Sequence, residues 1–209
     1  ISLRLVGSEM CIRDSDGNLA AYSEYLSHFK NDYKNLIMLT FGTGVGGGII
    51  YNSEIFKGSG NAGEIGRILI NEKSYLEDVI SAKAWTKKCQ ELYEINKETK
   101  LSNIFYEEKV GSLLFDRSID LEDYEKYARD EIIQNTSNAL ISLFELFDND
   151  IFVIGGSMTK SPYDFLPLLD EYISKNFEFP NRNFPKIKLS KAREDSGMLG
   201  AALLALNSE

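Results

Sequence analysis

The feature that most constrains the fold is a run of glycines directly after a short apolar stretch. Residues 35–41 read NLIMLTF, which is typical of a buried strand. Residues 42–48 read GTGVGGG, with five glycines in seven positions, and the apolar residues 49–51 follow. Glycine allows a backbone to approach a ligand closely, and successive free N–H groups form a nest for anions. The run therefore predicts a phosphate-binding loop between two strands, the alternative being a flexible glycine turn.

Two common phosphate motifs do not fit this loop. No Lys-Ser or Lys-Thr pair follows the glycines, which excludes a P-loop. Residues 49–56 predict a β-hairpin with its turn at Asn52-Ser53. A helix would have to follow the glycines in the dinucleotide-binding fingerprint, so that motif is excluded as well.

The rest of the chain alternates between helical and strand patterns. Helical spacing predicts a helix from Asp16 to about residue 29, and further helices over residues 76–93, 127–147, 161–173 and 198–206. Ser161-Pro162 is a suitable start for the fourth of these helices. Strands are expected at residues 151–154, closed by Gly155-Gly156, and at residues 186–189. Residues 58–66 form a second glycine-rich loop, and residues 98–123 a helical insertion. This alternation predicts an α/β fold.

Composition narrows the classes of function. The 209 residues are 43% hydrophobic and 26% charged, which is ordinary for a globular protein. The formal net charge of -9 argues against a nucleic-acid or membrane partner for this chain. No apolar run approaches the roughly 20 residues that span a bilayer. Cys11 and Cys89 have no metal-ligand spacing. Because no signal-peptide pattern is found, we expect a cytoplasmic protein.

The first fifteen residues, ISLRLVGSEMCIRDS, lack a sustained helical or strand period. They resemble translated sequencing-adapter segments, so we expect residues 1–15 to be non-native. The alternative is a genuine strand over residues 1–6. On the first interpretation the native part of the chain is residues 16–209.

Three carboxylates stand beside the glycine-rich segments. Asp16 heads the first predicted helix, Glu64 lies in the second glycine-rich loop, and Glu77 opens the next helix. Phosphoryl transfer to a sugar needs one carboxylate to accept the hydroxyl proton and others to orient hydroxyl groups. Each residue alone is also compatible with a helix cap or a solvated acid.

These segments together resemble the ROK family of bacterial sugar kinases and sugar-responsive repressors. The resemblance rests on residues 42–48, on Asn61-Ala62-Gly63-Glu64-Ile65-Gly66, and on shorter matches at residues 16–21, 75–77, 154–157 and 195–202. It implies that Asp16 is the catalytic base, although Ser15 stands where Asn is usual. It implies sugar contacts from Asn18, Glu64 and Glu77, with Arg67 where His is usual. ATP phosphates would be held at Gly42, Thr43, Gly44 and Gly46, and adenosine at Gly155 and Gly156.

The resemblance also sets expectations for the whole protein. It implies one lobe of the actin-like, hexokinase-like ATPase fold (ribonuclease H-like), with a mixed sheet flanked by helices. The implied activity is Mg²⁺-assisted, ATP-dependent phosphorylation of a hexose or N-acetylhexosamine. The alternatives are the sugar-sensing domain of a repressor and a non-catalytic paralogue. A homodimer is possible, as dimers are common in the family.

Three departures from the family pattern qualify these expectations. No Asp-x-Gly-Gly-Thr loop is found, so residues 16–209 are expected to be a C-terminal lobe that is inactive by itself. Arg67 replaces the family's zinc-ligating His, and the Cys-rich zinc loop is absent, so we expect no zinc. Arg67 has three interpretations: pairing with Glu64 or Glu77, contact with an acidic sugar, or a salt bridge filling the zinc site.

Overall fold

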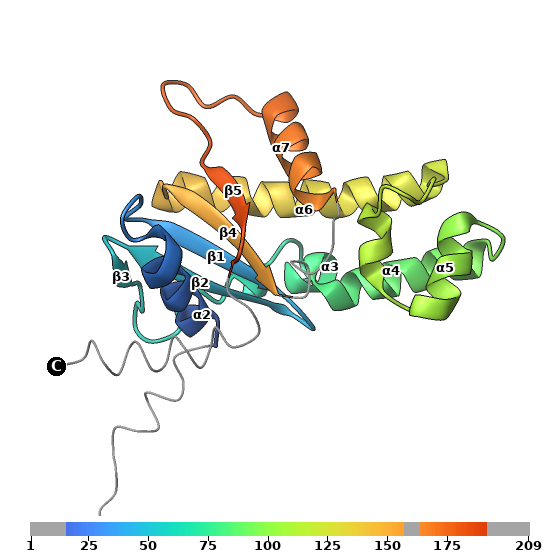
Figure 1. Ribbon diagram of the computed structural model, residues 1–209, viewed down its shortest axis with the longest axis horizontal. Coiled ribbons are helices and arrows are strands. Elements are labelled where there is room, and N and C mark those ends of the chain that lie inside the picture. Colours follow the sequence, from blue (N-terminus) through green and yellow to red (C-terminus); the bar gives the residue numbers. More distant parts are fainter. Residues whose placement is uncertain (1–15, 157–163, 192–209) are drawn as a thin grey trace, which may run out of the picture.

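The computed structural model describes residues 16–156 and 164–191 (Figure 1). The expected non-native segment, the Ser161-Pro162 helix start and the helix over residues 198–206 lie outside the described residues. No helix within the described ranges is long and apolar enough to cross a membrane.

The centre of the fold is a five-stranded mixed sheet with strand order β3-β2-β1-β4-β5. Its strands are β1 (Leu36–Phe41), β2 (Val45–Tyr51), β3 (Glu54–Ile55), β4 (Ile151–Gly156) and β5 (Lys186–Leu189). β1 pairs antiparallel with β2 and parallel with β4, and β5 continues the parallel half. The strands predicted from the apolar runs are therefore confirmed.

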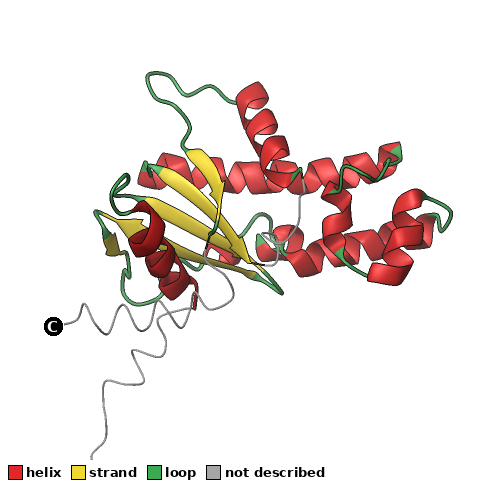
Figure 2. Cartoon of the chain, viewed as in Figure 1, coloured by secondary structure: helices red, strands yellow, loops and turns green. Residues whose placement is uncertain are grey.

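Two layers of helices cover the two faces of this sheet (Figure 2). One face carries α2 (Asp16–Glu24), continued by the π-helix η1 (Tyr25–Phe29). Its contacts include Ala21 and Tyr25, which pack with Leu36, Met38 and Ile50 of β1 and β2. The alternate residues Ile37, Leu39 and Phe41 point into the larger core on the opposite face.

The larger core lies among α3 (Glu77–Ile80), α4 (Ala82–Ile95), α6 (Asp123–Phe147) and α7 (Phe165–Asn176). Trp85 of α4 is fully buried there, with its ring 4.6 Å from that of Phe115 and 5.1 Å from that of Phe165. α4 and α5 (Lys100–Glu108) extend away from the sheet, followed by the 3-10 helix η3 (Gly111–Phe115) (Figure 1). Trp85 is thus an anchor of the core.

The glycine run is divided differently from the sequence prediction. Only Gly42–Gly44 forms a bend, because β2 begins at Val45 and includes Gly46, Gly47 and Gly48. These strand glycines are explained by packing: a Cβ on Gly48 would lie 2.5 Å from the Ala21 Cβ, and one on Gly47 would lie 2.6 Å from the Gly63 carbonyl oxygen. The run is therefore a short bend followed by the start of a strand whose residues 46–48 have no side chain, and other segments pack closely on Gly47 and Gly48.

Candidate functional site

The bend over residues 42–44 lies at the carboxyl end of β1, beside the end of β4. The register pairs Thr40 with Gly155 and Phe41 with Gly156. The bend after β1 and the Gly155-Gly156 end of β4 therefore lie at the same edge of the sheet, and both point toward α3 (Figure 1). Crevices outside the carboxyl ends of parallel strands are the usual ligand sites of such sheets.

The backbone of the bend is open to a ligand. The Gly42 amide donates to the Gly44 carbonyl oxygen at 3.0 Å, which closes the turn. The amides of Thr43 and Gly44 have no hydrogen-bond partner in the described part of the chain. A Cβ on Gly42 would meet no atom within 4 Å. Two neighbouring N–H groups without a partner are suited to phosphate oxygens, so the residues present fit this part of a nucleotide.

A cleft of about 380 Å³ joins this bend to one carboxylate. It is lined by the end of β1, the bend, the start of β2, Glu77 and Gly156. Glu77 begins α3, and its Oε2 accepts a hydrogen bond from the Val45 amide at 3.4 Å. A Cβ on Gly44 would lie 2.5 Å from the same oxygen, so glycine at position 44 lets the carboxylate approach the bend.

Arg67 contacts the other oxygen of this carboxylate. Its Nη1 lies 3.5 Å from Glu77 Oε1, and its guanidinium carbon lies 3.9 Å from the centre of the Tyr75 ring. The structure therefore contains an Arg67–Glu77 pair, which two of the three interpretations share: simple pairing and a salt bridge that fills the zinc site. The role of Tyr75 as an aromatic support is not evident from the sequence, although Tyr75 stands directly before Leu76-Glu77.

Asp16, Asn18 and Glu64 lie along β2 rather than in the cleft with Glu77. A Cβ on Gly17 would be 2.3 Å from the Gly47 carbonyl oxygen, so the first turn of α2 lies directly against β2. Asn18 is buried, and its Nδ2 donates to the Ala62 carbonyl oxygen at 3.5 Å. The glycine-rich loop that holds Glu64 is thereby joined to α2.

The side chains of Asp16 and Glu64 are exposed, and neither lines the cleft that contains Glu77. The structure thus forms two groups around the first half of β2: Asn18 with the loop before Glu64, and Glu77 with Arg67 and the bend. They are linked by Gly66, whose added Cβ would be 2.2 Å from the Val45 carbonyl oxygen.

A second carboxylate interaction, which the sequence did not reveal, fixes the other end of α2. Glu24 is fully buried and accepts hydrogen bonds from the Ser190 hydroxyl and the Lys191 amide, both at 2.8 Å. Ser190 in turn donates its amide to Ile154 of β4 at 2.8 Å. Glu24 thereby joins α2 to the segment after β5.

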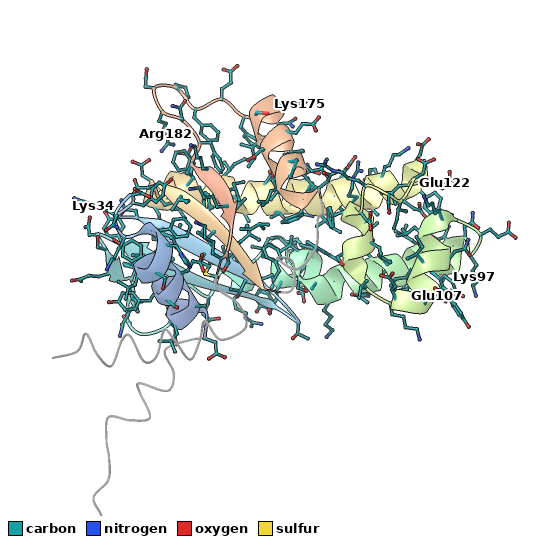
Figure 3. All side chains as sticks on the ribbon, viewed as in Figure 1. Lys34, Lys97, Glu107, Glu122, Lys175 and Arg182 are labelled. Atoms are coloured by element: carbon teal, nitrogen blue, oxygen red, sulfur yellow. The ribbon has the colours of Figure 1, made fainter. Side chains whose placement is uncertain are left out.

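Other polar groups lie apart from this region. Lys97, Glu107 and Glu122 lie far from the sheet, around α5 and at the start of α6 (Figure 3). Cys89 is buried, and burial raises the pKa of its thiol to about 12. Cys89 is a residue of the larger core. Within the described ranges, no three His, Cys, Asp or Glu side chains gather to hold a metal ion.

Comparison with known proteins places this geometry in a family. The model of the ROK family matches residues 7–208. A glucokinase from Halalkalibacterium halodurans is 27% identical over 214 residues, covering 95% of this chain and 64% of the relative. An N-acetylmannosamine kinase from Haemophilus influenzae is 26% identical over 190 residues, covering 90% and 60%. The chain therefore spans about three fifths of the length of these relatives.

Solved structures support the fold. A ROK family glucokinase from Streptomyces griseus, in complex with glucose and AMPPNP, matches 90% of this chain and 66% of its own, with 21% identity and a TM-score of 0.77. A ROK family transcriptional regulator, described as a homologue of the Escherichia coli MLC protein, matches 91% and 50%, with 21% identity and a TM-score of 0.75. These structures confirm the expected α/β fold with a mixed sheet. Because the family model matches residues 7–208, the chain belongs to the ROK family.

Proposed function

We propose that the protein catalyses ATP-dependent phosphorylation of a hydroxyl group on a hexose or an N-acetylhexosamine. The observation that carries this proposal is the cleft at the carboxyl end of β1, where the Glu77 carboxylate lies beside Gly42 and Gly44 of a bend whose Thr43 and Gly44 amides have no partner in the described residues. The relatives named glucokinase and N-acetylmannosamine kinase support the same class of reaction.

The residues have separate tasks in this proposal. Asp16 accepts the proton of the sugar hydroxyl while the hydroxyl oxygen bonds to the γ-phosphorus. The bond from that phosphorus to the β–γ bridging oxygen breaks at the same time. Asn18, Glu64 and Glu77 orient the other hydroxyls, and Arg67 offsets the charge of Glu77.

The nucleotide would be held by backbone. The Thr43 and Gly44 amides donate to phosphate oxygens, Gly42 leaves room for them, Gly46 lines the same cleft, and Gly155 and Gly156 face adenosine. Mg²⁺ bound to the phosphates would offset their negative charge. We propose no role for zinc, because Arg67 offers only donors.

The second candidate is a sugar sensor without transfer activity. The transcriptional regulator with a TM-score of 0.75 favours it, since that fold serves regulation as well as catalysis. A non-catalytic paralogue is a weaker form of the same idea. Asp16 argues for the kinase, because a sensor needs no base.

The test is ADP release by the full-length gene product, with a panel of neutral hexoses and N-acetylhexosamines. We expect one sugar to support turnover, Asp16→Asn to abolish turnover while retaining sugar affinity, and Asp32→Asn, an exposed acid just beyond η1, to behave as wild type. The 209-residue chain assayed alone is expected to be inactive. Sugar binding without turnover would favour the sensor. The absence of both binding and turnover would refute both candidates.

We also propose a cytoplasmic location, where ATP and sugars are available, and a homodimer. Sedimentation of the full-length protein tests the latter.

A further inference from the structure

A small hairpin joins Arg67 to Glu77. The Leu76 amide donates to the Ile68 carbonyl oxygen at 2.8 Å, and the Ile70 amide donates to that of Ser74 at 3.1 Å. Leu69 and Tyr75 form an isolated antiparallel bridge between these bonds. The Asn71 side chain closes the turn by accepting the amides of Lys73 and Ser74, both at 3.0 Å. Two residues ten positions apart are thus brought into contact by backbone pairing.

The two ends of this hairpin meet through side chains. The edge of the Arg67 guanidinium pairs with Glu77 Oε1, while its face lies on the Tyr75 ring. Glu77 Oε2 is occupied separately by the Val45 amide. Each carboxylate oxygen therefore has its own donor, one from the hairpin and one from β2, which restricts the orientation of the carboxylate.

We propose that Arg67 is a positioning residue: its stack on Tyr75 fixes the guanidinium, and its ion pair holds Glu77 against the bend. In this proposal the backbone pairing of the hairpin and the Arg67 guanidinium hold Arg67 and Glu77 together, and no metal ion is needed for that link. The consequence for sugar binding rests on the proposed function, whereas the positioning of Glu77 does not.

Solvent exposure separates this role from a contribution to stability. The Arg67 and Glu77 side chains are 56% and 28% exposed. Exposed ion pairs contribute little to folding free energy, because water screens them and side-chain entropy opposes them. A stacked guanidinium is nevertheless pre-organised, so its charge has a defined direction. Loss of Arg67 should therefore loosen Glu77 more than it destabilises the chain.

The first experiment needs no sugar. Hydrogen exchange of the Val45 amide is followed by NMR in the wild type, Arg67→Ala, Glu77→Ala and the double variant. We expect each single variant to speed exchange by roughly three- to tenfold, because Glu77 no longer accepts that hydrogen bond stably. The double variant should exchange no faster than Glu77→Ala. Additive rates, or a Val45 amide unaffected by Arg67→Ala, would overturn the proposal.

Two further variants test the stack and the specificity of the effect. Tyr75→Leu should speed Val45 exchange as Arg67→Ala does, and Arg67→Lys should be intermediate because it keeps charge without the planar face. Arg117→Ala is the matched control: Arg117 is 67% exposed and paired with Asp164, but lies outside the cleft. It should leave Val45 unchanged, and an equal effect from it would contradict the proposal.

The second experiment uses calorimetry with whichever sugar binds the full-length protein. Arg67→Ala should weaken sugar binding roughly tenfold, which is the size of one charge-assisted hydrogen bond. The double variant Arg67→Ala/Glu77→Gln should bind the sugar about as well as Glu77→Gln alone. Sugar binding should be unchanged by EDTA, and its loss would contradict the metal-free link. If Arg67→Ala abolishes only the binding of acidic sugars, Arg67 is a ligand contact and the proposal fails. If no sugar binds the wild type, the proposed function fails, while Val45 exchange still decides the positioning role.

Discussion

Replacement of Gly17 by Ala tests how closely the first turn of α2 approaches β2. Gly17 is the second residue of α2, where intrinsic propensity favours Ala over Gly by up to about 1 kcal/mol. The structure predicts the opposite sign. A Cβ there would lie 2.3 Å from the Gly47 carbonyl oxygen and 2.9 Å from two more backbone atoms of that residue.

The magnitude follows from what has to move. Ordinary carbon contacts begin near 3.4 Å, so α2 must retreat from β2 by about 1 Å. The obstacle is backbone and cannot rotate away, which places the cost near the upper end of the ~1–3 kcal/mol typical of overpacking. After the helix-propensity gain is subtracted, about 2 kcal/mol of destabilisation remains. For a chain of this length that corresponds to a Tm lower by roughly 4–8 °C.

The assay is urea unfolding followed by the fluorescence of Trp85, the single tryptophan in the chain. Gly42→Ala is the control, since a Cβ there meets nothing within 4 Å, and its stability should stay within about 0.5 kcal/mol of wild type. If Gly17→Ala is as stable as the wild type or more so, the close approach of α2 to β2 is wrong.

Three other changes have outcomes that the structure determines. Glu24→Ala should destabilise the chain by about 1–3 kcal/mol in urea unfolding, because the Ser190 hydroxyl and Lys191 amide lose their acceptor; an unchanged midpoint would contradict this. Trp85→Ala should cost about 3–5 kcal/mol, measured by circular dichroism, because the fully buried indole packs against three phenylalanine rings. In a Cys11→Ser variant, Cys89 should react with a thiol reagent at pH 9 only after urea is added, because burial raises its pKa to about 12 and keeps the folded thiol protonated where an unfolded one ionises; rapid labelling of that folded variant would refute the burial of Cys89.

The strands and long helices could be predicted because their signals are local. An apolar run such as residues 35–41 needs burial on both faces, and the sheet provides it with helices on each side. The spacing of Ile132, Ile133, Leu140 and Leu143 similarly defines the buried face of α6. Such patterns depend on the residue types along one element, so the fold class followed from the sequence.

The division of the glycine run could not be predicted in this way. A glycine that forms a bend and one that clears space for a neighbouring segment look the same in sequence. Gly47 is required because Gly63 and Ile65 pack on it, and these residues are distant along the chain. The end of the bend at Gly44 likewise depends on Val45 pairing with Phe41. The first contact joins segments that are distant in sequence, and the second sets the register of a tight hairpin.

Arg67 shows how contacts narrow the interpretations that a sequence leaves open. Arginine where the family has histidine was compatible with pairing, with an acidic ligand or with a filled metal site. The choice depends on the register of the hairpin between Ile68 and Leu76, which no single-residue preference encodes. Once that register is known, the edge of the guanidinium is directed at Glu77 and its face at Tyr75. An arginine whose edge faces Glu77 and whose face lies on Tyr75 has a fixed direction, so it is well suited to orienting the neighbouring carboxylate.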